Sequence, residues 1–357
     1  SLLRKAEPRH SDKLLEHPNI RITPIWSMEF KTIMWSIPLD PLFFYKIARS
    51  IIRCDVIQVW TFFYILCMSF IILHRFLRVF FRRSVLALTM DTIPKYTFSW
   101  SPIIDKAFVL YITLFRRVLF HWPNVIVLYS EKMVPIFKEI SRRTQGIIVQ
   151  STGVKTSVKR LDKQHIRKVL WNEYGIPQET FMILFVALLN HRKGVDLALQ
   201  TMKRLDRNRF CLVLLGNSSS RSFYENMARE MGIEDVTFFL GNRSDVASFF
   251  SAADAFFLPS RGEGLPGVVM ESMTYGLPVV TSNILCTNDL IQDDVNGRLC
   301  SMEDIDCYAH TFEDLSQREE LGDRYRRQAF KDIQRFDWKI IVSQYEEHYS
   351  QWLRARF

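Results

Sequence analysis

The chain has 357 residues, which is too long for one ordinary hydrophobic core and sufficient for two domains. Its apolar content of 48% and charged content of 24% are typical of a globular protein and exclude bulk disorder. The formal net charge is +9, and basic residues crowd the first half, which favours anionic partners. Because no nucleic-acid-binding motif occurs and the neighbouring sequence is very apolar, we expect an anionic membrane surface rather than nucleic acid.

The six cysteines and eight histidines show no metal-binding spacing. No C-x-x-C pair and no H-E-x-x-H cluster occurs, so we expect no metal site. Reduced, buried thiols in a cytosolic protein are the favoured interpretation of the cysteines.

Residues 55–73 form the most apolar run of the first half. A transmembrane helix needs about 20 such residues, so we favour a buried strand at 56–59 followed by a buried helix, with a membrane-spanning helix as the alternative. An apolar helix beside arginines suits attachment to a membrane interface. The basic residues expected on a membrane or acceptor face are Arg75, Arg78, Arg82, Arg83, Arg116 and Arg117.

The first half continues as alternating apolar strands and helices. A strand ends in a loop at 91–94, a helix covers 105–122, and buried strands follow at 124–130 and 145–154. Continuous apolar strands separated by helices predict a parallel sheet covered on both faces.

The second half repeats this pattern after a polar stretch, 155–180, that we interpret as a linker and a first helix. Five further strands alternate with helices, at 181–189, 210–216, 236–241, 255–260 and 277–282. The fold class is therefore α/β, with two Rossmann-like doubly wound domains facing a cleft. Ligands of such sheets bind outside the carboxyl ends of the strands. The loops at those ends are 91–94, 190–194, 216–220, 241–243 and 261–267.

The stretch RGEGLPGVVMESMTYGLPVV, residues 261–280, predicts a helix preceded by a glycine-containing turn. The helix should begin near Leu265, with Pro266 at its first position, and should stop at Gly276. Gly264 and Gly267 allow the backbone to approach a ligand closely. An uncapped helix amino end binds anions, so a diphosphate suits this position.

Two acids and a basic loop surround this helix start. Glu263 precedes the helix, and Glu271 lies roughly 9 Å along it at 1.5 Å per residue, so the pair suits the two hydroxyl-rich ends of a sugar nucleotide. Arg192 and Lys193 follow the 181–189 strand at the same end of the sheet and suit phosphate. The alternatives are a surface acid, a helical acid paired with a neighbour, and a solvated basic loop.

Five segments in order, RKGVDLAL, LVLLG, FLGNRSDV, AADAFFLPSRGEGLPGVVMESMTYGLPVV and DDVNGRL, resemble the donor-binding half of family-4 retaining glycosyltransferases with the GT-B fold. Glu263 and Glu271 match the E-x7-E element of that family. The resemblance covers about 150–330. The first half is similar more weakly, through LTMDTIPKYTFSW, and 336–353 resembles the helix that crosses back to the first domain.

The resemblance implies three parts: an acceptor and membrane-facing domain at 1–155, a nucleotide-sugar domain at 156–335, and a returning helix at 336–357. It implies that Lys193, with Arg192, binds the donor diphosphate, and that the backbone of Leu265, Pro266 and Gly267 surrounds it. Glu263 would bind hydroxyls of the transferred sugar and Glu271 the ribose. Residues near the base would be Gly216, Asn242 and Arg243. No metal is required for such transfer, and the leaving phosphate helps to deprotonate the acceptor.

The sequence departs from the family pattern in three ways. Ala187 and Leu188 stand where the family has Gly-Arg, so either Arg192 substitutes or donor binding is weaker. Met90 stands where the family often has a histidine, so a hydrogen-bonding or acid role in this loop would fall to Asp91. The family opens with a strand and a glycine-rich loop that this sequence lacks, so we expect an incomplete first domain.

The leading hypothesis is a retaining transferase that moves a sugar from a nucleotide sugar to a lipid-linked or polysaccharide acceptor at the cytoplasmic membrane face. The alternative is a non-catalytic subunit that binds a nucleotide sugar or glycan and docks to a membrane or a partner. The departures at Leu188 and at the chain start favour the alternative, and the presence of Glu263, Glu271 and Lys193 opposes it.

Overall fold

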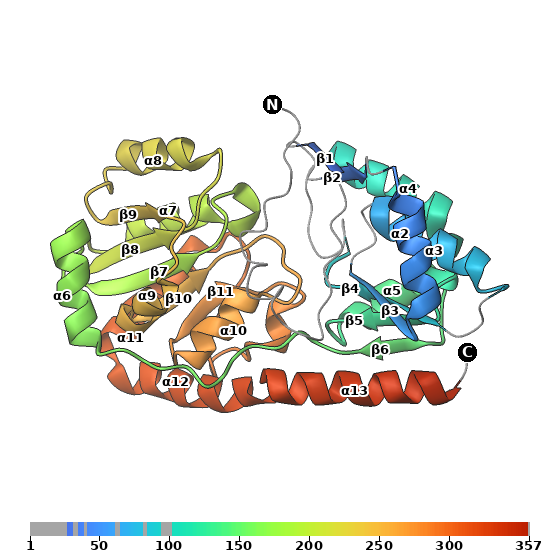
Figure 1. The fold of residues 1–357 in the computed structure, drawn as a ribbon. Helices are drawn as coiled ribbons and strands as arrows, with labels where there is room; N and C mark the ends of the chain where they lie inside the picture. Colours follow the sequence, from blue (N-terminus) through green and yellow to red (C-terminus); the bar gives the residue numbers. More distant parts are fainter. Residues whose placement is uncertain are drawn as a thin grey trace.

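The structure is a computed structural model that describes residues 27–30, 35–38, 41–60, 65–80, 84–93 and 102–355. Two parallel sheets, of four and six strands, form the centres of two α/β halves (Figure 1). A small antiparallel pair, β1 (Ser27–Phe30) and β2 (Trp35–Pro38), precedes them. The predicted fold class of two doubly wound domains is confirmed.

The first sheet has its strands in chain order, β3-β4-β5-β6. Its strands and helices are β3 (Val56–Trp60), β4 (Val85–Met90), β5 (Val125–Leu128), β6 (Ile147–Val149), α2 (Phe43–Arg53), α3 (Ile65–Leu77), α4 (Pro102–His121) and α5 (Met133–Ser141). Every residue of β4 and β5 is buried, as expected of parallel strands covered on both faces. The apolar run at 55–73 contains strand β3 and the first nine residues of helix α3, which continues to Leu77. Within the described ranges no helix has the length and apolar character needed to cross a bilayer.

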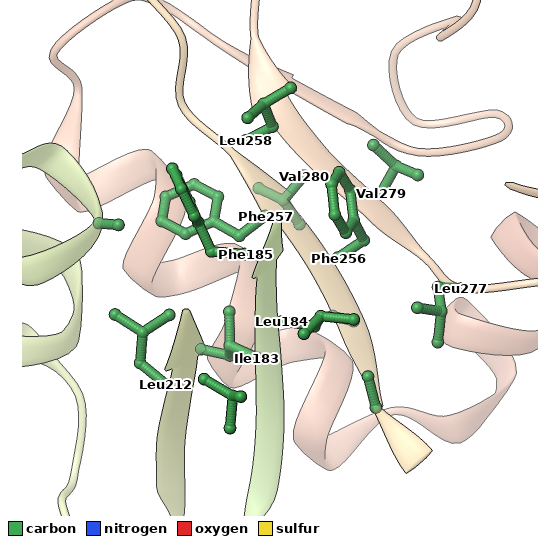
Figure 2. Packing of buried hydrophobic residues seen from close by; sticks show 14 of the residues in the cluster. Ile183, Leu184, Phe185, Leu212, Phe256, Phe257, Leu258, Leu277, Val279 and Val280 are labelled. Carbon is green, nitrogen blue, oxygen red and sulfur yellow. The ribbon is translucent and has the colours of Figure 1, made fainter. Parts of the chain in front are cut away.

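The second sheet has the order β12-β11-β10-β7-β8-β9. Its strands are β7 (Phe181–Val186), β8 (Phe210–Leu215), β9 (Thr237–Gly241), β10 (Ala255–Leu258), β11 (Val279–Ser282) and β12 (Arg298–Cys300). Phe185, Phe256 and Phe257 pack among aliphatic side chains of neighbouring strands in its core (Figure 2). The chain runs outward from β7 to β9 and then returns to β10 on the other side of β7. This reversal of strand order makes the carboxyl ends of β7 and β10 the place where a ligand crevice is expected.

Helices and short 3-10 turns connect these strands. They are α6 (Lys163–Tyr174), η1 (His191–Lys193), α7 (Val195–Arg204), α8 (Arg221–Glu230), α9 (Val246–Ala252), α10 (Gly267–Thr274), η2 (Thr287–Asp289), α11 (Ile305–Gln317), α12 (Glu319–Ile333) and η3 (Gln334–Phe336). η1 carries the predicted basic loop, and α10 is the helix of the opening motif.

The last helix, α13 (Trp338–Ala355), returns from the second half and runs beneath the first sheet (Figure 1). Trp352 packs against valines of β4 and β5, and Gln150 Nε2 donates to Gln344 Oε1 at 2.8 Å. At the crossing, the Val154 amide donates to the Phe336 carbonyl at 2.8 Å, and the Trp338 amide donates to Val154 at 3.1 Å. The domain boundaries at 155 and 335 stay predictions.

The cysteines differ in part from expectation. Cys300, at the end of β12, forms a disulfide with Cys307 in the first turn of α11, so these two are not reduced thiols. The two residues are only seven apart in sequence, and the turn before α11 folds the chain back, which the spacing alone did not indicate. Cys67, Cys211 and Cys286 are buried and form no disulfide, and Cys54 is exposed.

Candidate active site

Helix α10 presents an uncapped amino end. The helix begins at Gly267 and no side chain caps it, so the predicted start near Leu265 is wrong by two residues. Pro266 is the N-cap rather than the first helical residue, because its backbone is extended (ψ 101°) and its carbonyl accepts from the Val269 amide at 3.0 Å. A Cβ added at Gly267 would meet no atom within 4 Å, so space remains at this end. Gly276 ends the helix in the left-handed conformation (φ +66°), as predicted.

Glu263 and Lys193 form a buried ion pair beside this helix. Lys193 Nζ lies 2.7 Å from Glu263 Oε1 and 2.8 Å from Oε2, and Glu263 is only 4% exposed. Ser260 Oγ donates a further hydrogen bond to Glu263 Oε1 at 2.6 Å. A carboxylate buried to this degree needs such partners to offset its lost hydration. The two predicted residues, from loops 70 positions apart, therefore share one site.

The loop that carries Lys193 is shaped by its neighbours. Asn190 caps η1 by accepting from the Lys193 amide at 3.0 Å. Gly194 has φ +73°, and an added Cβ would lie 2.0 Å from the carbonyl oxygen of Pro259, so only glycine fits this contact between the two loops. Arg192 donates to the Gly262 carbonyl at 3.0 Å and lies 3.7 Å from Glu263 Oε2. Both predicted basic residues thus border the same carboxylate.

Burial shifts the pKa of the charged groups along this helix. Burial lowers the pKa of Lys193, and the Glu263 carboxylate opposes that shift only in part. Partial removal from water raises the pKa of Glu271. A lysine in such surroundings gains from an anionic ligand, because the local dielectric is low and the attraction is strong.

Glu271 lies on the next turn of α10. Together with Gly267, Thr274 and Tyr275 it lines a cavity of about 420 Å³. Lys155 of the interdomain segment and Trp338 of α13 line the same cavity. Glu271 therefore belongs to the same helix as the uncapped amino end but to a different group of side chains from the Lys193–Glu263 pair.

Asp91 approaches the site from the first domain. Asp91 follows β4 directly and is exposed. Its backbone carbonyl oxygen lies so close to Gly264 that a Cβ added to this glycine would be only 2.6 Å from it. The loop after β4 therefore packs on the turn between Glu263 and α10. This brings the predicted acceptor-loop residue next to the predicted donor site.

The remaining predicted donor residues lie at the ends of β8 and β9. The Gly216 amide donates to the Gly241 carbonyl at 2.8 Å. Gly216 has φ +134°, and an added Cβ would lie only 1.8 Å from the carbonyl oxygen of Ala187. Asn242 is exposed. Arg243 makes two hydrogen bonds with Asp245, at 2.8 and 2.9 Å, and stacks over Tyr174.

The residues that depart from the family pattern lie at the end of β7. Leu188 is 52% exposed, so the position where the family has an arginine presents an apolar side chain to solvent. Arg192, the substitute considered above, lies on the following turn.

The predicted basic face is assembled from two helices. Arg75 of α3 and Arg116, Arg117 and His121 of α4 line a cavity of about 430 Å³ together with Trp122. Arg78 is half-buried. Arg82 and Arg83, like Pro94 of the acceptor loop, lie outside the described residues.

Sequence reasoning missed three polar residues of the site. Ser260 bonds Glu263, and Arg261 makes two hydrogen bonds to Asp196, at 2.8 and 2.7 Å. Arg261 is the first residue of the 261–280 stretch that contains Glu263, and Ser260 directly precedes it, so their polarity at the end of a buried strand was an available signal. Asp196 offered no comparable signal, because it reads as an ordinary acid in the first turn of a helix.

Comparison with known proteins identifies the second half of the chain. A family model described as "Glycosyl transferases group 1" matches residues 167–332. This segment, a little under half of the chain, is therefore similar to the glycosyl transferases group 1 family. The match contains η1 with Lys193, the Glu263 turn and α10, so every element of the site in the second domain lies within the family segment.

Curated relatives share this region at modest identity. A D-inositol 3-phosphate glycosyltransferase of Corynebacterium aurimucosum is 25% identical over 236 residues, which cover 63% of this chain and 56% of the relative. An N-acetyl-alpha-D-glucosaminyl L-malate synthase of Bacillus anthracis is 24% identical, over 63% of this chain and 61% of its own length. The chain thus spans roughly half to three-fifths of the length of these two relatives.

Solved structures share the fold over more of the chain. Anabaena Alr3699/HepE, in complex with UDP and glucose, superposes with a TM-score of 0.72 at 20% identity, over 88% of this chain and 82% of the other. The sucrose-phosphate synthase of Thermosynechococcus elongatus gives a TM-score of 0.72 at 17% identity, over 95% and 87% of the two chains. At these identities the likeness establishes the two-domain GT-B fold.

Proposed function

We propose that the protein is a retaining glycosyltransferase that takes a sugar from a nucleoside diphosphate sugar. The observation that carries the proposal is the uncapped amino end of α10 beside the buried Lys193–Glu263 pair. An anion at a helix amino end gains from the backbone amides and the helix dipole, and a nearby ammonium adds a charge-assisted contact. The UDP and glucose held by Alr3699/HepE support a uridine donor as the first to test.

In this proposal each residue has one task. Lys193, with Arg192, neutralises the diphosphate, and Glu263 accepts hydrogen bonds from hydroxyls of the transferred sugar. Glu271 accepts hydrogen bonds from the ribose, which would occupy the cavity along α10. Charge that develops on the departing diphosphate is stabilised by amides fixed in advance, which is the effect that lowers such barriers.

The acceptor would approach from the first domain. Asp91 lies against Gly264 and would orient the attacking hydroxyl, while the leaving phosphate takes its proton. The anomeric configuration is then retained because attack and departure occur on the same face of the sugar. No metal is needed in this scheme, because Lys193 and the amides supply the compensating positive charge.

We also propose that the first domain binds an anionic membrane from its cytoplasmic side, where a lipid-linked or polysaccharide acceptor is presented. Large apolar side chains are exposed on α4, the helix that also supplies Arg116 and Arg117 to the arginine-lined cavity; Leu110 is 60%, Leu114 68% and Ile103 82% exposed. Apolar side chains that enter a bilayer interface beside arginines that meet anionic headgroups are the features of peripheral attachment.

A thermal-shift panel of UDP-, GDP- and ADP-sugars tests the donor class. A ligand at a hundred times its Kd stabilises the folded protein by about 2.7 kcal/mol, which gives a measurable rise in Tm. We expect one nucleotide to raise Tm and its sugar to be transferred to an added glycan acceptor. No rise with any of the three would contradict the proposed donor, whereas a rise without any transfer or hydrolysis would favour the non-catalytic binding subunit that the exposed Leu188 suggests.

A further inference from the structure

Arg261 connects the two loops that form the donor site. Its guanidinium donates to Asp196 Oδ1 at 2.8 Å, to Asp196 Oδ2 at 2.7 Å and to the His191 carbonyl at 2.8 Å. A third carboxylate oxygen, Glu303 Oε1, lies 3.1 Å away, and the Arg261 amide donates to the Arg192 carbonyl at 2.8 Å. One residue of the Glu263 loop therefore binds both the η1 turn that carries Lys193 and the first turn of α7 that follows it.

The position of these contacts explains what they hold. Arg261 stands two residues before Glu263, and Asp196 stands three residues after Lys193, in the first turn of α7. Because β7 and β10 are neighbouring strands, their ends start close together, but the loops beyond them have no sheet hydrogen bonds to keep them in register. The contact of Gly194 with Pro259 brings the loops together, and the Arg261–Asp196 pair fixes their relative position.

The pair is shielded from solvent. The side chains of Arg261 and Asp196 are 16% and 15% exposed, whereas those of the Arg207–Asp235 pair in the same domain are 54% and 52% exposed. A two-pronged arginine–carboxylate contact in such surroundings is stronger and more directional than an exposed pair.

We propose that Arg261 is a positioning residue that, with Asp196, holds the Arg192–Lys193 turn against Glu263 so that the donor diphosphate meets a preformed site. The inference rests on the proposed function and deepens it. Four of the five N–H groups of Arg261 already have acceptors within the protein, so in this proposal Arg261 acts through the loops. Without this contact the η1 turn could move, and ordering it on donor binding would make the binding free energy less favourable.

The test is calorimetric titration of UDP, with GDP and ADP in parallel, into wild type, Arg261→Ala, Asp196→Asn and the double variant. We expect each single variant to weaken nucleotide binding on the order of tenfold, and the double variant to be no weaker than the worse single one. Arg261→Lys keeps the positive charge but cannot make the two-pronged contact with Asp196, so it should also weaken nucleotide binding. Added guanidinium should restore binding in Arg261→Ala. Arg207→Ala and Asp235→Asn are the matched controls and should bind as wild type does.

The outcomes separate two kinds of failure. Equal binding by wild type and Arg261→Ala, each folded by circular dichroism, overturns the positioning role and leaves the proposed function standing. Weak binding by Arg261→Ala with full binding by Asp196→Asn also overturns it, because Arg261 would then contact the phosphate itself. Should Arg261→Ala fail to fold, Arg261→Lys and Asp196→Asn decide the question. Wild type that binds none of the three nucleotides overturns the proposed function and this inference with it.

Discussion

Glu263 and a bound diphosphate would compete for the same ammonium group. In the structure, Lys193 Nζ is shared between the two oxygens of Glu263. A diphosphate carries more negative charge than one carboxylate, so the proposed donor draws Lys193 toward the helix amino end and leaves Glu263 to meet sugar hydroxyls. This exchange makes Glu263 important for transfer and expendable for nucleotide binding.

Glu263→Gln tests this division of tasks. We expect sugar transfer to fall about a hundredfold, since a carboxylate that contacts the reacting sugar is lost. UDP should bind at least as tightly as to wild type, because Lys193 no longer has a competing anion. The check is calorimetry of UDP combined with a transfer assay. Unchanged turnover, or loss of UDP binding in step with turnover, would remove Glu263 from its proposed role.

The pH dependence of donor binding reports on Lys193. Burial lowers its pKa below the ordinary value of 10.5, so the folded protein gives up this proton at a lower pH than the unfolded chain does. The buried charge therefore opposes folding at pH values below the lowered pKa, and this cost disappears as the pH rises toward 10.5. Donor binding, which needs the cation, should weaken as the pH rises through the lowered pKa.

Titrations of UDP across the alkaline range measure this effect. Lys193→Arg should keep binding to a higher pH, because a guanidinium stays protonated. Wild-type binding that is constant up to pH 10.5 would show that the charge of Lys193 does not matter.

At this scale the sequence indicated which residues matter but not how they pair. Lys193 and Glu263 could be placed at one end of the sheet because each follows a buried strand. Their ion pair depends on the contact of Gly194 with Pro259, which no local pattern encodes. Arg261 and Asp196 are 65 residues apart, so their pairing became visible only in three dimensions.

The element that defines the site is α10, and two glycines at its start have different tasks. Gly264 packs against the backbone of Asp91 from the other domain, whereas the space beside Gly267 is empty within 4 Å. A side chain at position 264 would therefore clash with the protein itself. A side chain at position 267 would clash only with a bound ligand.

Substituting alanine at each position separates the two. Gly264→Ala should lower Tm, because a Cβ 2.6 Å from a carbonyl oxygen forces the domains apart. Gly267→Ala should keep or raise stability, by about 0.5–1 kcal/mol for alanine over glycine in a helix, and yet weaken UDP binding. Thermal unfolding and calorimetry measure both. Full UDP affinity in Gly267→Ala would contradict a diphosphate at this position.

The strands were easier to predict than some helices. Each expected strand at 181–189, 210–216 and 255–260 contains an observed one, because runs of buried apolar residues with polar ends are typical of parallel sheets. Helix α2 was not predicted, although its buried residues Phe43, Ile47 and Ile51 recur at helical spacing. Strand β12 has three residues and offers too short a pattern to detect.

On the scale of the whole molecule, the two halves are joined through the site as well as through the linker. Cys286, in the loop after β11, is fully buried in the core of the first half. Lys132 of the first half lies 3.6 Å from Asp289 in the same loop. Closure of the domains on a donor would therefore move two loops, those after β4 and β11, that already touch both halves.

The proposed membrane face predicts salt-sensitive binding to anionic vesicles. Changing Arg75, Arg116 and Arg117 to glutamine removes three charges from one cavity, so binding to phosphatidylglycerol vesicles should weaken and the remaining binding should depend less on salt. The matched control changes three exposed arginines of the second half to glutamine, namely Arg204, Arg207 and Arg318. This control should leave vesicle binding unchanged. Equal binding of both triple variants in a sedimentation assay would refute this surface.

The two-domain organisation could be read from the sequence because the strand–helix alternation restarts after a polar segment. The contacts between the halves could not, since they join positions such as Asp91 and Gly264 that lie far apart in the chain. The arginines of α3 and α4 were predicted as a basic region, but their meeting around one cavity follows from helix packing.

The central claim is that a sugar diphosphate binds at the amino end of α10 between Lys193 and Glu263. The most direct measurement is the electron density of a crystal grown with UDP-glucose. We expect the diphosphate to lie within hydrogen-bonding distance of the Gly267 amide and of Lys193 Nζ, with the Lys193–Glu263 pair loosened. A diphosphate bound elsewhere, with that ion pair intact and the helix end vacant, would contradict it.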